Sequence, residues 1–290
     1  MKKYLPVLLL LLVALFAKAG QTPAQRDALP ANPFQQFFEK AYQEHPSIPK
    51  GVLEAVAFTN THFAHLTANE PESCTGMPRA YGVMGLVADG KNYFRNNLTL
   101  VSQLSGYTTD EIISSPEKNI LAYAKAYELL YSGFDNVDPS SPEGMVSILN
   151  SLSELPDNGS LGNNYAMNTH LFSVLSFLND EKYSAKYKFP KYEINLATIF
   201  GDENLKVLSA PFIIMSSEKI SDKNGNIFKG TTLPVVQSAD YPPAAWVASP
   251  NYSARNSSIS AVTIHTVQGS YAGCISWFQN CAASVSAHYV

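Results

Sequence analysis

Two histidines near the end of the chain have the side chains best suited to bind a metal ion. His265 lies in the stretch SAVTIHTV, where Val262 and Ile264 alternate with polar residues. Alternation with a period of two predicts a strand and places His265 on the face opposite the two apolar side chains. His288 lies in a second alternating stretch, SVSAHYV. Neutral imidazole is a common zinc ligand, although a lone histidine on a strand fits a structural or surface role as well.

The segment between the two histidines predicts a helix from about Ala272 to Asn280, so this region reads as strand, helix, strand. Cys274 and Cys281 bracket the helix, and a disulfide between them is expected if the helix end turns back. The alternative is that one of these thiolates binds zinc. If Cys274 and Cys281 form the disulfide, Cys74 remains unpaired.

The motifs TIHTVQGSYAG and SAHYV resemble the zinc-dependent N-acetylmuramoyl-L-alanine amidases related to phage T7 lysozyme and to peptidoglycan-recognition proteins. The resemblance covers about the last fifty residues. It implies that His265 is the first Zn²⁺ ligand and that His288 lies in the substrate groove. It also implies that a zinc-activated water cleaves the amide between the muramic acid lactyl group and L-alanine in peptidoglycan.

In that family the remaining zinc ligands, a histidine and an Asp or Cys, lie far downstream of the first. Here the sequence ends at Val290. We therefore expect a C-terminally truncated chain that carries only the first strand, helix and strand of an α/β amidase domain.

The start of the chain predicts export. Lys2 and Lys3 precede an apolar run from Leu5 to Phe16, and Ala17 and Ala19 form a cleavage site for a signal peptide over residues 1–19. The run is too short for a comfortable membrane span, and a polar linker over residues 20–33 follows it. We expect a periplasmic or extracellular bacterial protein without a stable membrane anchor.

The composition is that of an ordinary globular protein. Hydrophobic residues make up 46% of the chain, charged residues 15%, and the formal net charge is -4 over 290 residues. Such a charge balance argues against a nucleic-acid partner.

Residues 34–180 predict a mainly helical domain. Ser115-Pro116-Glu117 and Ser141-Pro142-Glu143 are helix starts, because each combines a cap, a proline at the first position and an acidic first turn. Apolar residues at helical spacing follow both starts, and a third such series begins after Asn164.

Three stretches of this domain, IPKGVLEAVAFTNTHFAHL, YGVMGL and SPEKNILAYAKAYELL, resemble in their order the lysozyme-like fold of lytic transglycosylases and goose-type lysozymes. In that family a glutamate near the end of the first helix protonates the glycosidic oxygen, and Asn60 matches its position. An amide does not titrate, so it cannot act as the acid. The resemblance therefore implies a groove that holds glycan through Asn60 without cutting it.

Two other functions stay open. One is a glycosidase that uses Glu54, or the loop carboxylates Glu70 and Glu72; the other is a non-catalytic peptidoglycan-binding protein. His62 and His65 lie three residues apart with no third ligand at helical spacing nearby, so we interpret them as surface or groove residues.

The remaining segments complete the predicted organisation. Residues 181–235 predict a small strand-rich connector, with a hairpin turn at Asn224-Gly225. Residues 236–290 are assigned to the amidase part, which begins with a proline-rich stretch. Together the segments predict a multidomain α+β chain: a mainly helical lysozyme-like domain, the connector, and the first strand, helix and strand of an α/β amidase domain.

Overall fold

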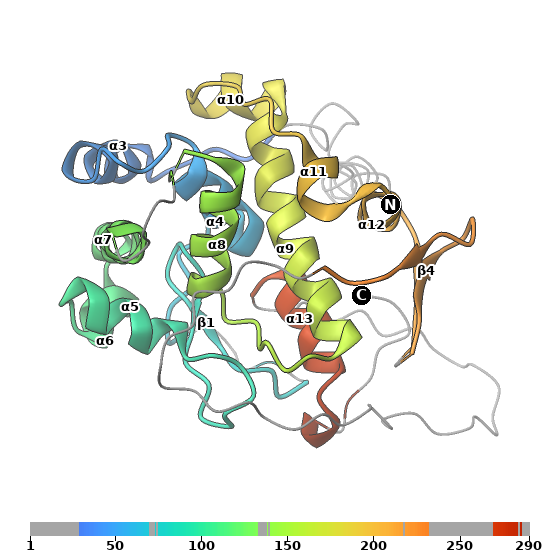
Figure 1. Ribbon diagram of the computed structural model, residues 1–290. Coiled ribbons are helices and arrows are strands. Elements are labelled where there is room, and N and C mark those ends of the chain that lie inside the picture. Colours follow the sequence, from blue (N-terminus) through green and yellow to red (C-terminus); the bar gives the residue numbers. More distant parts are fainter. Residues whose placement is uncertain are drawn as a thin grey trace, which may run out of the picture. The chain divides into compact units, whose positions relative to one another are not determined.

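A computed structural model describes residues 29–69, 73, 75–132, 138, 140–216, 218–231, 269–283 and 285. The chain divides into residues 1–31 and 32–290, and all the elements named here belong to the second part (Figure 1). In chain order they are α3 (Gln35–Glu44), α4 (Val52–Thr61), β1 (Ala80–Tyr81), β2 (Leu86–Val87), α5 (Asn97–Ser105), α6 (Thr109–Ser114), α7 (Pro116–Ser132), α8 (Pro142–Leu152), α9 (Leu161–Asn179), α10 (Glu181–Tyr187), α11 (Leu196–Phe200), α12 (Asp202–Leu208), β3 (Ile213–Met215), β4 (Ile220–Asp222), β5 (Ile227–Phe228), α13 (Tyr271–Phe278) and a 3-10 turn (Cys281–Ala283).

The long helix α9 lies in the middle of one group of helices, whereas α3, α5 and α6 pack against α7 (Figure 1). Leu171, Leu175 and Leu178 on it are completely buried, and so is the polar Asn168 on the same helix. A helix that is buried nearly all round belongs in the middle of a core. Its packing partners are α4, α8, α10, α11, α12 and α13.

The helix starts predicted from the sequence are confirmed. Pro116 and Pro142 are the first residues of α7 and α8. The Ser141 hydroxyl accepts a hydrogen bond from the Gly144 N–H at 3.0 Å, and Ser160 caps α9 in the same way. These caps satisfy N–H groups that the helix itself leaves without partners. The mixed, mainly helical character of the prediction is therefore correct.

The prediction of a strand-rich segment is wrong for residues 181–208, which form α10, α11 and α12. The alternating residues before Leu196 imitate a strand pattern. The decisive residue is Asn195, whose Oδ1 accepts hydrogen bonds from the N–H groups of Ala197 and Thr198 and so begins α11. A capping side chain thus overrides a short period-two pattern.

Strands do occur in the second half of that segment. β3, β4 and β5 form an antiparallel sheet in that order. The turn between β4 and β5 contains the predicted Asn224-Gly225 pair, with Gly225 at a φ of 86°. The Asp222 carboxylate accepts hydrogen bonds from the N–H groups of Asn224 and Asn226, which closes the turn.

The helix predicted from Ala272 to Asn280 is present as α13, and it packs against α9. The strands predicted around His265 and His288 lie outside the described residues. The domain boundaries proposed from the sequence remain predictions. Among the helices that the structure describes, none combines the length and apolar character needed to cross a membrane.

A tyrosine from the preceding helix caps α4. Gly51, the residue before α4, has no side chain to cap the helix, and the Tyr42 hydroxyl of α3 accepts hydrogen bonds from the N–H groups of Gly51 and Leu53 at 2.8 and 3.1 Å. The same hydroxyl donates to the Glu54 carboxyl at 2.5 Å. One side chain therefore satisfies three polar groups that are buried at the α3–α4 contact.

We expect Tyr42→Phe to lower the free energy of unfolding by about 2–4 kcal/mol, because buried donors and acceptors lose their partner. The matched control is Tyr127→Phe. Tyr127 is also buried, but its hydroxyl has no hydrogen-bond partner in the described part of the chain, so its removal should not lower the free energy of unfolding. Urea denaturation of both variants measures the difference, and equal effects would contradict the capping role of Tyr42.

Candidate functional site

The structure describes one of the three residues that the sequence analysis placed in a functional site. Asn60 belongs to α4, whereas His265 and His288 lie outside the described residues, as do Glu70 and Glu72. The zinc ligand and the groove residue predicted near the end of the chain therefore stay predictions. Within the described residues, no group of three His, Cys, Asp or Glu side chains could hold a metal ion.

Asn60 lies in the last turn of α4, and its side chain is 9% exposed. Its Nδ2 donates a hydrogen bond to the Met84 carbonyl at 2.9 Å, while its Oδ1 has no partner among the described residues. The neighbouring Thr61 hydroxyl donates to the Val83 carbonyl at 2.7 Å. Both side chains tie the end of α4 to the turn between β1 and β2, and one acceptor of Asn60 remains unused.

Two glycines let this turn approach the helices closely. Gly82 and Gly85 have φ values of 71° and 66°, which glycine adopts without strain. A Cβ on Gly82 would lie 1.9 Å from Asn119 of α7, and one on Gly85 would lie 2.8 Å from the Asn60 Cβ. The Asn119 Oδ1 in turn accepts a hydrogen bond from the Met84 N–H at 2.8 Å. The YGVMGL motif therefore joins the end of α4 to the first turns of α7.

Glu54, the alternative acid considered from the sequence, is 2% exposed. Burial raises the pKa of its carboxyl from 4.5 to about 7, and the hydrogen bond from Tyr42 opposes that rise. A raised pKa suits a general acid, but this carboxyl points into the α3–α4 contact, where it bonds the Tyr42 hydroxyl. The geometry gives Glu54 a structural partner and no open groove.

The two histidines after α4 do not form a pair of ligands. His62 is exposed and follows α4 at a φ of 52°, and its ring lies 4.7 Å from that of Phe58. His65 is partly buried, and desolvation lowers the pKa of its ring. The structure thus gives these residues aromatic and loop contacts.

A further group of residues, which no sequence motif indicated, comes together around α13. The Tyr93 hydroxyl donates to the Ser276 carbonyl at 2.7 Å, across 183 positions of sequence. The Ser276 hydroxyl donates to the Asn163 Oδ1 at 2.7 Å, and the Ser270 hydroxyl donates to the Glu154 carboxylate at 2.9 Å. Ser270 before α13 is a recognisable capping signal, but its distant partners have no local signature.

Charged groups are buried next to α13. Glu154 is 3% exposed and interacts electrostatically with Arg95 and His170. Burial lowers the pKa of both Arg95 and His170, with Glu154 opposing the shift in each case. The Arg95 Nε and the His170 Nδ1 have no hydrogen-bond partner among the described residues. The Arg95 Nη2 donates to the Asn150 carbonyl at 2.7 Å, and the Glu154 carboxylate has the Ser270 hydroxyl as a donor, so the group is partly satisfied within the protein.

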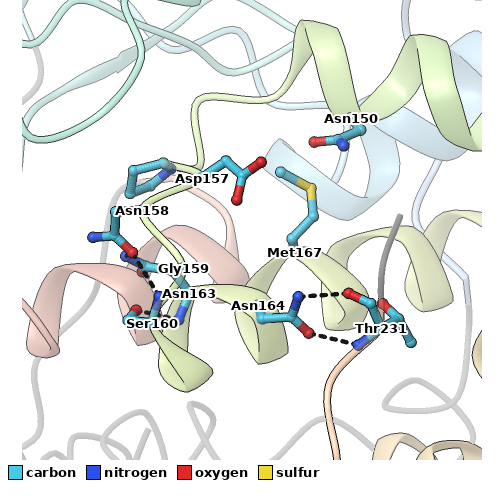
Figure 2. A pocket seen from close by; sticks show the side chains of 10 residues that line it. Asn150, Asp157, Asn158, Gly159, Ser160, Asn163, Asn164, Met167 and Thr231 are labelled. Atoms are coloured by element: carbon cyan, nitrogen blue, oxygen red, sulfur yellow. Dashed lines mark hydrogen bonds between the residues drawn. The ribbon is translucent and has the colours of Figure 1, made fainter. Parts of the chain in front are cut away.

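A polar cavity of about 200 Å³ lies at the start of α9. Figure 2 shows Asp157 and Asn158 on the loop before α9 together with Asn163 and Asn164 on the helix itself. The Asn164 amide forms two hydrogen bonds with the backbone of Thr231, so this wall is fixed. The full lining is Asn150, Pro156, Asp157, Asn158, Gly159, Ser160, Asn163, Asn164, Met167 and Thr231.

The prediction of a disulfide between Cys274 and Cys281 is wrong. Cys274 is a free, buried cysteine in the structure, so it does not form a bond with Cys281 there. Burial raises the pKa of the Cys274 thiol to about 11. Cys274 lies on the part of α13 that packs into the protein, where it acts as a small apolar side chain. Cys74 lies outside the described residues.

The raised pKa of Glu54 predicts a dependence of stability on pH. The folded protein holds this carboxyl neutral up to about pH 7, whereas the unfolded chain ionises it near 4.5. The unfolded chain therefore binds fewer protons in this range, and the free energy of unfolding falls as the pH rises from about 4.5 to 7, by up to about 3 kcal/mol. Glu54→Gln should remove this fall.

Urea denaturation at several pH values measures the effect, with Glu44→Gln on the exposed end of α3 as the control for loss of a carboxylate. An equal pH dependence in the wild type and in Glu54→Gln would contradict the assignment.

Comparison with known proteins gives one similarity. No protein-family model matches the chain, and no solved structure matches it. N-acetylmuramoyl-L-alanine amidase A of Achromobacter lyticus is 55% identical to it over 53 residues, which are 18% of this chain and 30% of that protein. The chain thus spans less than a third of this relative's length in the match. The similarity supports a local relationship to an amidase.

Proposed function

We propose that the chain acts on peptidoglycan as an N-acetylmuramoyl-L-alanine amidase. The observation that carries the proposal is the 55% identity to such an amidase over 53 residues. The length of the match is close to that of the C-terminal stretch in which TIHTVQGSYAG and SAHYV resemble amidase motifs. The reaction is hydrolysis of the amide between the muramic acid lactyl group and L-alanine.

His265 is the proposed first ligand of a zinc ion, and His288 the proposed contact with substrate. Imidazole nitrogen suits zinc, and bound zinc polarises a carbonyl and lowers the pKa of its water to about 7. A substrate in the cell wall also agrees with the signal peptide predicted over residues 1–19 and with export from the cytoplasm.

The helical part has the proposed role of holding glycan. Asn60 occupies the position of the catalytic glutamate in the lysozyme-like resemblance, and this amide, which does not titrate, is the proposed contact with glycan. Glu54, the carboxyl on the same helix, is bonded to Tyr42 in the interior. Both observations favour binding over glycosidic cleavage, and a non-catalytic peptidoglycan-binding protein is the second candidate function.

The test is to express the protein from its whole gene, to incubate it with peptidoglycan and Zn²⁺, and to quantify new amino termini and new reducing ends. We expect new amino termini without reducing ends, and a loss of at least about a hundredfold in His265→Ala, because a metal contributes several kcal/mol to such a reaction. The control is His62→Asn, which keeps a residue that tolerates the positive φ at this position.

Each result separates the candidates. New reducing ends would contradict the amidase function and indicate a glycosidase. If the chain sediments with insoluble peptidoglycan but does not cleave it, the result supports the non-catalytic peptidoglycan-binding protein. Full activity in His265→Ala would contradict the proposed role of His265 as a zinc ligand.

A further inference from the structure

The small sheet of β3, β4 and β5 contacts α12, and one of its faces packs into the protein (Figure 1). Ile220 of β4 and Phe228 of β5 lie opposite each other in the strand register, and both side chains are buried in the hydrophobic core. Successive residues of a strand point to opposite faces. The residues next to these two in sequence therefore lie on the other face of the sheet, which we call the outer face.

Three large apolar side chains lie on the outer face. Ile214 of β3 and Ile227 of β5 both pair with Ser221 of β4, so the three residues form one row across the sheet. Phe212 stands two positions before Ile214 and shares its face. Phe212, Ile214 and Ile227 are 49%, 56% and 42% exposed. A group of exposed apolar side chains on one short sheet is typical of a surface that binds a partner.

Three lysines accompany these apolar side chains. Lys219 and Lys229 stand two positions from Ser221 and Ile227, so alternation places both of them on the outer face. Lys223 lies in the turn between β4 and β5. All three lysines are exposed, and none of them forms an ion pair with another described residue.

The acidic residues near the sheet do not balance the lysines. Asp222 is buried, and its carboxylate accepts hydrogen bonds from two N–H groups of its own turn. Glu203 of α12 interacts electrostatically with Lys229, but its carboxylate forms an ion pair with Lys206 at 2.7 Å. Glu218, in the turn between β3 and β4, is exposed. The sheet thus presents three exposed lysines, one exposed carboxylate and an apolar centre.

An anionic lipid surface matches both properties of this face. Lipid acyl chains accept apolar side chains, and lipid phosphates attract lysines. A second copy of the chain would place the lysines of two such faces against each other. Residues 232–268 contain a single acidic residue, Asp240, and so supply too few carboxylates for three lysines. Charge complementarity therefore favours the lipid over both of these occupants.

We propose that the outer face of the β3–β5 sheet binds the surface of an anionic phospholipid bilayer. The three apolar side chains enter the boundary between headgroups and acyl chains, and the three lysines contact lipid phosphates. The contact is reversible, because three side chains bury much less apolar area than a helix that spans a membrane. The inference goes beyond the proposed amidase function and does not depend on it.

The test is sedimentation of the protein, expressed from its whole gene, with vesicles of phosphatidylglycerol and phosphatidylcholine at about 0.1 M NaCl. We expect binding to the mixed vesicles, and binding at least about tenfold weaker to vesicles of phosphatidylcholine alone, because these carry no net charge. We also expect a rise in the salt concentration to weaken binding to the mixed vesicles.

Two variants examine the apolar and the basic part of the face separately. We expect Ile214→Ser to weaken binding to the mixed vesicles by about tenfold, and Lys219→Gln by about fivefold. The matched controls are Leu129→Ser on α7, where the side chain is 43% exposed, and Lys186→Gln on α10. Both controls should bind as the wild type does. Any other apolar segment is the same in all these proteins, so a difference between them belongs to the sheet.

Three results would overturn the proposal. The first is that the wild type does not bind the mixed vesicles, and the second is an equal loss of binding in Ile214→Ser and Leu129→Ser. The third is a wild-type dimer in sedimentation velocity that Ile214→Ser converts to a monomer without any change in vesicle binding, which would assign the face to a second copy. The cleavage assay uses peptidoglycan without membranes, so its outcome is independent of this test.

Discussion

The close approach of one turn to two helices is the constraint on which the arrangement of the helical region depends. Gly82 and Gly85 have no Cβ, so the backbone of the turn lies directly against Asn119 and Asn60. The two asparagines then bond the carbonyl and the N–H of Met84. This contact sets the end of α4, the β1–β2 hairpin and the start of α7 relative to one another, and it buries Asn60 within the fold.

At the other end of α4, too, one side chain satisfies several buried polar groups. The hydroxyl of Tyr42 serves as the cap that Gly51 cannot provide, and it also bonds the Glu54 carboxyl. Burial holds that carboxyl largely neutral at a pH where an exposed glutamate is ionised. A perturbed pKa alone would suggest a catalytic acid, but the partner and the position show a structural role.

α13 connects the two parts that the sequence resemblances separate. It belongs to the stretch in which amidase motifs occur, yet it packs against α9 and bonds Glu154 and Asn163 of the helical region. Ala272, Ile275 and Trp277 of α13 belong to the same hydrophobic core as Leu171 and Leu175 of α9.

Elements whose signals lie within a few neighbouring residues could be predicted from the amino-acid sequence. Ser141 and Ser160 begin their helices, and Asn224-Gly225 makes its turn, because each signal acts within a few residues of its own position. The sequence also indicated the amidase motifs, and the local identity supports their family. The alternating pattern around Asn195 predicted a strand, but the Asn195 side chain caps a helix there.

Contacts between side chains that are distant in sequence could not be predicted from local patterns. The cap on α4 comes from Tyr42 of another helix, and Tyr93 reaches Ser276 across 183 positions. Cys274 is a free thiol because α13 packs it into the protein, which no spacing of cysteines reveals. Such contacts depend on how separate elements pack their faces together. A local sequence pattern does not identify which distant residue the partner is.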